Sequence, residues 1–337
     1  MQYPTPFFLA AIFFGLIGCQ QQAPKQESTP PPPEATIVDD GSIFSVLIAH
    51  QGTVVSEQYF NGKTQDSLCD VQSLTKGLMS ILVGIAIDRG EIASLDEPIA
   101  DYFPEILREE PTKSAITIRH LLNQTSGLAW QGHLEHADWL SSASPNEYVL
   151  KKELVATPGQ VYNYNSGATH LLSAIVTQAT GMPTMEFAEE VLFEPLDFGP
   201  VDWQIRNDGH YDGSGLGLKM RPVDLMKLGQ LLANQGTWHG QSVVSADWVA
   251  QLFGLEDKMP TEWGLRNSKH GMCWYAAEYQ GQAIHYGMGY GGQFILIMPD
   301  LDLIVVTTHN ADTPDGIDQQ ITFLKRDLPK LMATYGG

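Results

Sequence analysis

Two pairs of β-rich segments near opposite ends of the chain place the strongest constraint on its fold. Residues 43–49 and 53–60 form the first pair, and residues 293–298 and 303–308 form the second. Turn-forming residues separate the members of each pair, so each pair predicts a hairpin of antiparallel strands. Because an isolated hairpin cannot bury its apolar face, we expect the two pairs to join in one antiparallel sheet built from both chain ends.

The segments between these strands are mainly helical. Apolar residues at helical spacing predict helices over residues 73–89, 166–180 and 222–234, and a closing helix over about 316–334 that Pro329 kinks or shortens. The expected fold class is therefore α+β. It is an α/β sandwich in which helices flank an antiparallel sheet and a mostly helical insertion separates the two halves of the sheet.

Ser73 and Lys76 form an S-x-x-K motif at the predicted start of a helix. Three residues apart on a helix, the two side chains share a face and can touch. The helix N-terminus offers free N–H groups and a positive dipole end, which stabilise an oxyanion, while an apolar environment lowers the pKa of the lysine toward that of a general base. Alone the motif is weak, and a capping serine beside a solvated lysine explains it equally well.

Tyr164 stands on a loop directly before the helix predicted from Ser166. A tyrosine in this position can present its phenol to a cleft. Beside a lysine ammonium the phenol is expected to ionise more readily and to act as a base or proton shuttle. The alternative is a tyrosine that packs at a helix entrance.

The order of these motifs resembles the serine β-lactamase-related proteins. This family includes class C β-lactamases, D-Ala-D-Ala carboxypeptidases, esterases and 6-aminohexanoate-oligomer hydrolases, and its motifs are S-x-x-K, then Y-x-N or Y-x-S, then K-T-G or a variant. The resemblance covers about residues 43–333, including intervening stretches such as Thr125-Ser126-Gly127-Leu128. It implies a β-lactamase/transpeptidase-like fold with Ser73 as the acylated nucleophile, Lys76 as its activating neighbour and Tyr164 as their partner.

The third motif of the family is implied at His285-Tyr286-Gly287, where His stands in place of the β-lactamase Lys. Met288 would then supply the second N–H of the oxyanion hole, alongside the N–H of Ser73. Tyr290-Gly291-Gly292 is a competing register for this motif.

Two departures from the family pattern bear on the substrate. His285 lacks the fixed charge that meets a substrate carboxylate, and Ser166 offers a short hydroxyl where many relatives have Asn. Y-x-S resembles the esterase and 6-aminohexanoate-oligomer hydrolase branch. We therefore expect a serine hydrolase of small esters or amides that needs no cofactor. The alternatives are a D-Ala-D-Ala carboxypeptidase or weak β-lactamase and, from another class, a non-catalytic envelope binding protein.

The N-terminus predicts a secreted lipoprotein. Residues 1–18 resemble a signal peptide whose apolar region is too short to span a bilayer, and Leu16-Ile17-Gly18-Cys19 resembles the lipobox in which the cysteine is acylated. Residues 19–41 are rich in Gln and Pro and predict an extended tether. Residues 42–337 would then form the hydrolase domain.

This N-terminus also predicts the location. Residues 1–6 contain no Lys or Arg, so an ordinary cleaved signal with an incidental Cys19 is the alternative. Gln20 after Cys19 favours the outer membrane of a Gram-negative cell by resemblance. The expected location is the bacterial cell envelope, anchored through lipid alone and facing the periplasm.

Composition narrows the partners. The formal net charge of -20 argues against nucleic acid, and the oligomeric state stays open. The loop with His133, Glu135, His136 and Asp138 lacks H-E-x-x-H spacing, so we read it as a polar rim and expect no metal.

In the predicted domain, Cys69 and Cys273 are interpreted as two buried small side chains, with a periplasmic disulfide as the alternative. Trp130 and Trp139 line the cleft or belong to the core.

Overall fold

The computed structural model describes residues 1–2, 37–108, 110–255, 258–261 and 264–335. Cys19 and nearly all of the predicted signal peptide and tether therefore lie outside the described residues. At the start of the described domain, Ile37 is buried in an apolar cluster, and Arg326 donates a hydrogen bond of 3.0 Å to the Val38 carbonyl.

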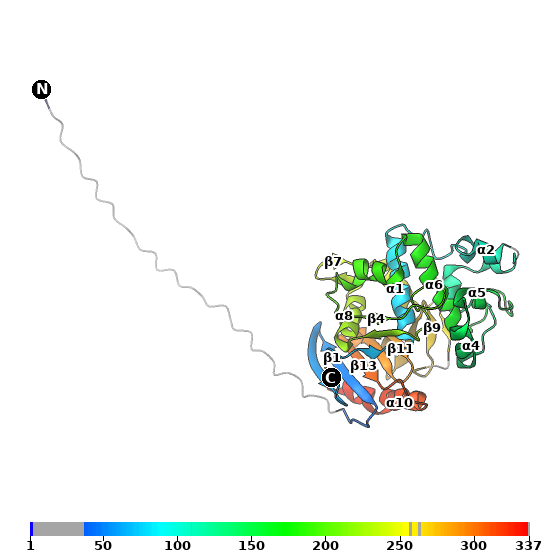
Figure 1. Ribbon diagram of the computed structural model, residues 1–337. Coiled ribbons are helices and arrows are strands. Elements are labelled where there is room, and N and C mark those ends of the chain that lie inside the picture. Colours follow the sequence, from blue (N-terminus) through cyan, green and yellow to red (C-terminus); the bar gives the residue numbers. More distant parts are fainter. Residues whose placement is uncertain (3–36, 109, 256–257, 262–263, 336–337) are drawn as a thin grey trace. The chain divides into compact units, whose positions relative to one another are not determined.

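One eight-stranded antiparallel sheet organises the described domain (Figure 1). Its order is β2-β1-β13-β12-β11-β10-β9-β8, so the first hairpin pairs directly with the last strand. The predicted sheet built from both chain ends is thus confirmed. The strands are β1 (Ile43–His50), β2 (Thr53–Tyr59), β8 (Met259–Pro260), β9 (Lys269–Gly271), β10 (Trp274–Tyr279), β11 (Gln282–Gly289), β12 (Gln293–Met298) and β13 (Leu303–His309).

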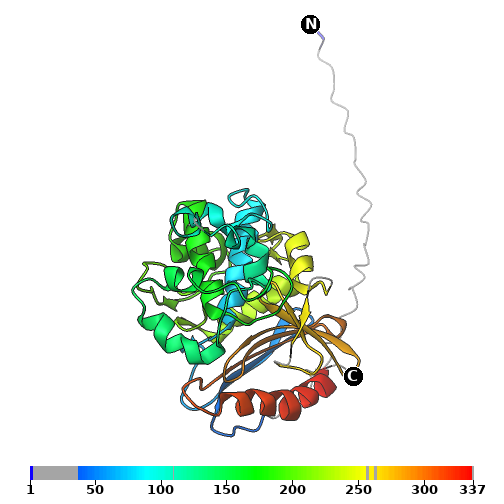
Figure 2. The same ribbon diagram turned by 90° about the vertical axis from the view of Figure 1, so that its right-hand side faces the viewer.

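The central strands are buried on both faces, which explains their continuous apolar runs. Along β1, Val46 and Ile48 pack into a cluster with the C-terminal helices, whereas Leu47 and Ala49 pack on the opposite side. Figure 2 shows these two layers, with the C-terminal helices on one face of the sheet and the helical insertion on the other.

The predicted long helices are confirmed as α1 (Leu74–Asp88), α6 (Ser166–Thr180) and α8 (Pro222–Ala233). The closing helix is divided: α10 (Gly316–Thr322) passes through a π-helical turn over Phe323–Asp327 into α11 (Leu328–Tyr335). Pro329 has no N–H to donate back to the preceding turn, and a π-turn accommodates this gap without ending the helix. The other helices are α2 (Pro104–Leu107), α3 (Ile118–Leu122), α4 (His136–Ser141), α5 (Pro145–Leu150), α7 (Thr184–Ala188) and α9 (Ala246–Phe253).

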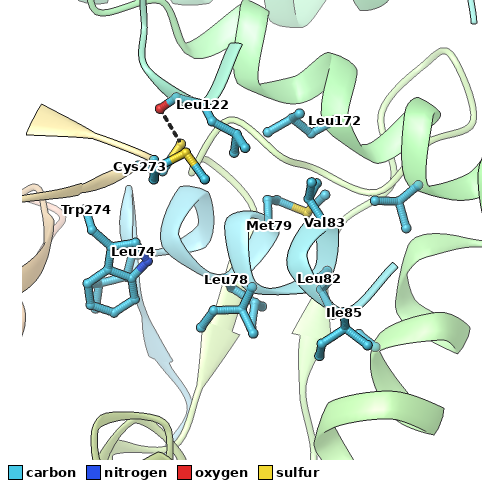
Figure 3. Close-up of a cluster of buried hydrophobic side chains, with 14 of the residues drawn as sticks. Leu74, Leu78, Met79, Leu82, Val83, Ile85, Leu122, Leu172, Cys273 and Trp274 are labelled. Atoms are coloured by element: carbon cyan, nitrogen blue, oxygen red, sulfur yellow. Dashed lines mark hydrogen bonds between the residues drawn. The ribbon is translucent and has the colours of Figure 1, made fainter. Parts of the chain in front are cut away.

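Helix α1 runs through the middle of the apolar core. Figure 3 shows Met79 and Val83 on the side of α1 that faces Leu172 of α6, and Leu78 and Leu82 on the opposite side. A helix that is apolar on all sides must be buried, and α1 is buried along nearly its whole length. The first residue of this helix is therefore held rigidly.

A small three-stranded sheet leads into α1. Its order is β3 (Cys69–Asp70), β5 (Leu218–Met220) and β4 (Asp202–Trp203), so segments far apart in the chain meet just before Ser73. Cys69 and Cys273 are both buried free thiols, which confirms their interpretation as small buried side chains. No helix among the described residues is long and apolar enough to cross a membrane.

Candidate active site

Ser73 occupies the N-cap of α1, directly after a sharp turn. Gln72 has a positive φ of 50°, unusual for a residue with a side chain, and its N–H donates to the Asp70 carboxylate at 3.0 Å. The side chain of Ser73 is partly exposed although the helix behind it is buried. The nucleophile predicted from the sequence thus stands at the accessible end of a rigid helix.

Lys76 lies one helical turn behind Ser73 and is almost completely buried, at 2% exposure. Its Nζ donates to Ser73 Oγ at 3.1 Å and also to the carbonyl oxygen of Ser214. Burial lowers the pKa of Lys76 to about 8, against the opposing influence of Cys273 and Asp212. The predicted contact and the predicted direction of the pKa shift are both confirmed, and a useful fraction of this lysine is neutral near pH 7.

Tyr164 completes the group. A hydrogen bond joins its phenol to Ser73, and Lys76 Nζ lies 4.8 Å from the centre of its ring. The loop that carries it is fixed on both sides, because Gln124 accepts the N–H of Asn163 at 2.8 Å and Asn165 caps α6 by accepting the Ala168 N–H at 2.9 Å. The structure therefore brings the three predicted catalytic residues together.

The expectation of an easily ionised phenol is wrong. Burial raises the pKa of Tyr164 above its ordinary value, and the hydrogen bond to Ser73 offsets only part of this effect. Tyr164 is therefore protonated in the resting site, and Lys76 is the better placed base. The phenol can still relay a proton between Ser73 and a leaving group.

A buried wall of aromatic and basic groups adjoins Tyr164, and the sequence did not reveal it. The His270 ring centre lies 6.2 Å from that of Tyr164 and 4.8 Å from that of Tyr275. Lys258 donates to the carbonyls of Gly271 and Trp274 at 2.6 and 3.0 Å, and burial lowers its pKa to about 7. A single histidine or lysine between short strands carries no recognisable signal, so only the fold identifies this wall.

The structure corrects the placement of His285. Its ring stacks on Phe253 at 4.4 Å, and the side chain lines a separate cavity of about 380 Å³ together with Pro299 and Asp302. Neither Ser73, Lys76 nor Tyr164 lines that cavity. Along β11 every second side chain points to the same face, and the positions of this face that lie against residues 71–74 are Gly287 and Gly289. Its assignment to the position of the family's Lys is therefore wrong.

Two glycines of β11 lie beside the nucleophile. A methyl group at Gly287 would meet Leu74 Cδ2 at 2.7 Å, and one at Gly289 would collide with the Val71 carbonyl and the Gln72 side chain. Met288 between them pairs with Phe294 and buries its side chain on the opposite face of the sheet. Its N–H as an oxyanion donor stays a prediction.

The side chain of Tyr290 does not favour the competing register Tyr290-Gly291-Gly292 for the third motif. Its hydroxyl donates to the Thr313 carbonyl at 2.8 Å and accepts the Gly316 N–H at 3.2 Å, both near the C-terminal helices. Ser166 is buried in the first turn of α6, two residues beyond Tyr164. Its contact with substrate stays a prediction.

Of the remaining candidates, Glu135 has structural partners. Glu135 is paired with Lys152 and Tyr148. No set of three His, Cys, Asp or Glu residues in the described part of the chain is arranged to hold a metal ion. Trp130 and Trp139 both belong to the buried core.

Comparisons with known proteins agree with the geometry of the site. The family model described as Beta-lactamase matches residues 43–328. The D-alanyl-D-alanine-carboxypeptidase/endopeptidase AmpH of Escherichia coli is 30% identical over 305 residues, covering 78% of each chain. The 6-aminohexanoate-dimer hydrolase of Paenarthrobacter ureafaciens is 22% identical over 290 residues, covering 80% of this chain and 73% of its own. Among solved structures, the octameric penicillin-binding protein homologue from Pyrococcus abyssi matches with a TM-score of 0.65 at 20% identity, over 83% of this chain and 72% of its own.

Proposed function

The chain belongs to the beta-lactamase family, and from this premise we propose that it is a serine hydrolase that cleaves small esters or amides through an acyl-enzyme on Ser73. One observation carries the proposal. The Ser73 hydroxyl is within hydrogen-bond reach of both a buried lysine, at 3.1 Å, and a buried tyrosine. A serine becomes a nucleophile when a neighbouring base takes its proton, and Lys76 has a pKa suited to that task.

The proposed reaction has two steps. Neutral Lys76 takes the proton of Ser73 as Oγ attacks the substrate carbonyl carbon, and backbone N–H groups that include that of Ser73 hold the oxyanion. The tetrahedral intermediate collapses when the Lys76–Tyr164 pair returns the proton to the leaving alcohol or amine. Water then attacks the acyl-enzyme with the same pair as base, releases the acid and restores the Ser73 hydroxyl.

The preference for small esters or amides over β-lactams and D-Ala-D-Ala peptides rests on what borders the nucleophile. The sequence of β11 is QAIHYGMG, which contains no Lys or Arg, and His285 faces another cavity. A penicillin or a D-Ala-D-Ala peptide carries a carboxylate that needs a positive partner, which β11 does not provide. The 6-aminohexanoate-dimer hydrolase is named for a small amide substrate, which supports cleavage of small amides.

Two alternatives remain testable. The similarity to AmpH favours a D-Ala-D-Ala carboxypeptidase. A weak β-lactamase belongs to the same alternative, because it would acylate the same serine. A non-catalytic envelope binding protein is disfavoured by the intact contact between Ser73 and Lys76.

The deciding experiment compares the parent protein with Ser73→Ala on p-nitrophenyl esters, small amides, nitrocefin and D-Ala-D-Ala peptides. We expect ester or amide turnover and fluorophosphonate labelling in the parent, with both lost in Ser73→Ala. The exposed Ser94→Ala serves as the matched control and should retain both. Faster turnover of D-Ala-D-Ala peptides, or a stable fluorescent penicillin adduct, would favour the carboxypeptidase. Absence of labelling in the parent would favour the binding protein.

We also propose that the enzyme is held at the outer membrane by a lipid on Cys19, as the lipobox-like sequence predicts. Metabolic labelling with a fatty acid should mark the parent and not Cys19→Ser, which should leave the membrane fraction. Membrane retention of unlabelled Cys19→Ser would contradict this anchor.

A further inference from the structure

A buried carboxylate organises the turn over residues 212–216. Asp212 is fully buried, and its oxygens accept the backbone N–H groups of Ser214, Gly215 and Leu216 at 2.9, 2.8 and 3.1 Å. The Ser214 hydroxyl also donates to the same carboxylate at 2.9 Å. Four donors from one short segment thus converge on one side chain, and this fixes the backbone of the turn.

The turn presents a carbonyl to the active site. Because the N–H and the hydroxyl of Ser214 are both bound by Asp212, the carbonyl oxygen of Ser214 is directed elsewhere, and it accepts a hydrogen bond from Lys76 Nζ. Ser214 is itself buried, at 1% exposure. The lysine that activates Ser73 is therefore held on its far side by a group whose position Asp212 determines.

A second layer of charges surrounds Asp212. Arg206 donates from Nε to its carboxylate and from its terminal nitrogen to the Leu216 carbonyl at 2.7 Å. From helix α6, His170 Nδ1 accepts the Gly213 N–H at 3.2 Å, which places its proton on Nε2, 3.1 Å from Asp208. The turn is thus tied to the helix that follows Tyr164.

We propose that Asp212 is a positioning residue of the active site, which presents the Ser214 carbonyl to Lys76 and compensates the ammonium charge that forms when Lys76 takes the Ser73 proton. Arg206 is the opposing charge that limits this compensation. The inference rests on the proposed function, since it assigns Lys76 the role of base.

The charges around Lys76 are consistent with this role. Asp212 and Cys273 act to raise the pKa of Lys76 against the larger lowering effect of its burial. Lys76 in turn contributes to the lowered pKa values of His136 and His270, both of which burial lowers first. The phenol of Tyr164 is protonated and carries no charge. Asp212 supplies the negative charge near Lys76: burial acts to raise its pKa, but Arg206 and the backbone donors lower the pKa and keep the carboxylate ionised.

The test uses two variants that change the charge in opposite directions. Asp212→Asn removes the negative charge and should move both the Lys76 pKa and the acid limb of kcat/KM to lower pH by about one unit. Arg206→Gln leaves Asp212 without its counter-charge and should move both to higher pH. In Asp212→Asn, kcat should also fall about 10- to 100-fold with little change in KM, because the base is no longer held in place. Asp202→Asn, a half-exposed carboxylate on neighbouring β4, should change neither quantity.

The Lys76 pKa is measured by NMR titration of its labelled side chain, which needs no substrate. This separates the inference from the proposed function: absence of turnover in the parent would contradict the latter, while the opposed NMR shifts would still decide the former. Shifts in the same direction, or an unmoved Lys76 pKa in both variants, would overturn the role of Asp212. If Asp212→Asn does not fold, the upward shift in Arg206→Gln decides alone.

Discussion

Gly215 lies directly against the backbone of the nucleophile: a methyl group on its Cα would be 2.8 Å from the Cα of Ser73 and 3.0 Å from its nitrogen. The residue also has a φ of +98°, which side chains disfavour. We expect Gly215→Ala to lower the free energy of unfolding by about 2 kcal/mol or more and to reduce Ser73 labelling strongly, because the helix start must shift.

The matched control for this change is Gly209→Ala. Gly209 has a similar φ of +83°, but a methyl group there would meet no atom within 4 Å. Only backbone strain should then be felt, about 1 kcal/mol, with labelling unchanged. Urea unfolding and fluorophosphonate labelling measure the two effects, and equal results for both variants would disprove the close approach to Ser73.

The pKa of Lys76 predicts the pH dependence of the reaction. A base must be deprotonated to act, so kcat/KM should rise with pH, with a midpoint near 8, and level off above it. Lys76→Arg should abolish this rise and lower kcat/KM by at least about 10³-fold, because a guanidinium does not give up its proton in this range. Lys151→Arg, at an exposed surface pair with Glu147, should leave the profile intact. A parent profile that is flat between pH 6 and 9 would contradict Lys76 as the base.

Tyr164→Phe tests the proton relay. Removing the hydroxyl deletes its hydrogen bond to Ser73 while keeping the ring beside Lys76, so we expect kcat to fall about 10²- to 10⁴-fold. Tyr162→Phe is the matched control. Tyr162 lies two residues before Tyr164, its ring also packs near His270, and the proposed reaction gives its hydroxyl no role. Steady-state kinetics on one ester decides, and equal losses in the two variants would remove Tyr164 from the mechanism.

The features that sequence patterns predicted are those that depend on local spacing. Hairpins at both ends, the start of α1 and the contact between Ser73 and Lys76 follow from turn chemistry and helical geometry. The third motif failed because a strand offers only a period of two, and no local signal states which residue lies opposite the nucleophile. Gly287 and Gly289 mark the positions of close approach, whereas the prediction for His285 rests on analogy with a lysine.

The features that sequence patterns missed depend on burial and on backbone atoms. The Ser214 carbonyl reaches Lys76 from 138 residues away, and a carbonyl has no sequence signature. The direction of the Tyr164 pKa shift depended on the balance between burial and charge, and burial wins at this site. The sequence signal for this turn is the run Asp212-Gly213-Ser214-Gly215, which combines an Asp with two glycines.

The corrected position of His285 leads to a prediction about β11. His285→Gln should change kcat/KM on a small ester by less than about twofold, because its ring stacks on Phe253 outside the site. Gly289→Ala on the same strand should lower it by about tenfold or more, since the added methyl collides with the Val71 carbonyl just before Ser73. The two variants are compared in one assay. A large loss in His285→Gln with a small loss in Gly289→Ala would restore the assignment of His285 to the substrate.

The buried lysine also predicts how stability changes with pH. The pKa of Lys76 is about 8 in the folded protein and 10.5 as its ordinary value, so between these values the unfolded chain binds one more proton than the folded one. Stability contributed by this group therefore rises as the pH increases from 8 to 10.5, by up to about 3 kcal/mol, and below pH 8 the buried ammonium is destabilising.

Lys76→Met should accordingly be inactive yet more stable than the parent at pH 7, by about 1–3 kcal/mol, with the difference shrinking toward pH 10. Urea unfolding of both proteins at pH 6 to 10 measures this, and Lys151→Met at the exposed pair with Glu147 should show no such trend. A Lys76→Met protein that is less stable than the parent at every pH would mean that the hydrogen bonds of the ammonium to Ser73 and Ser214 outweigh its desolvation.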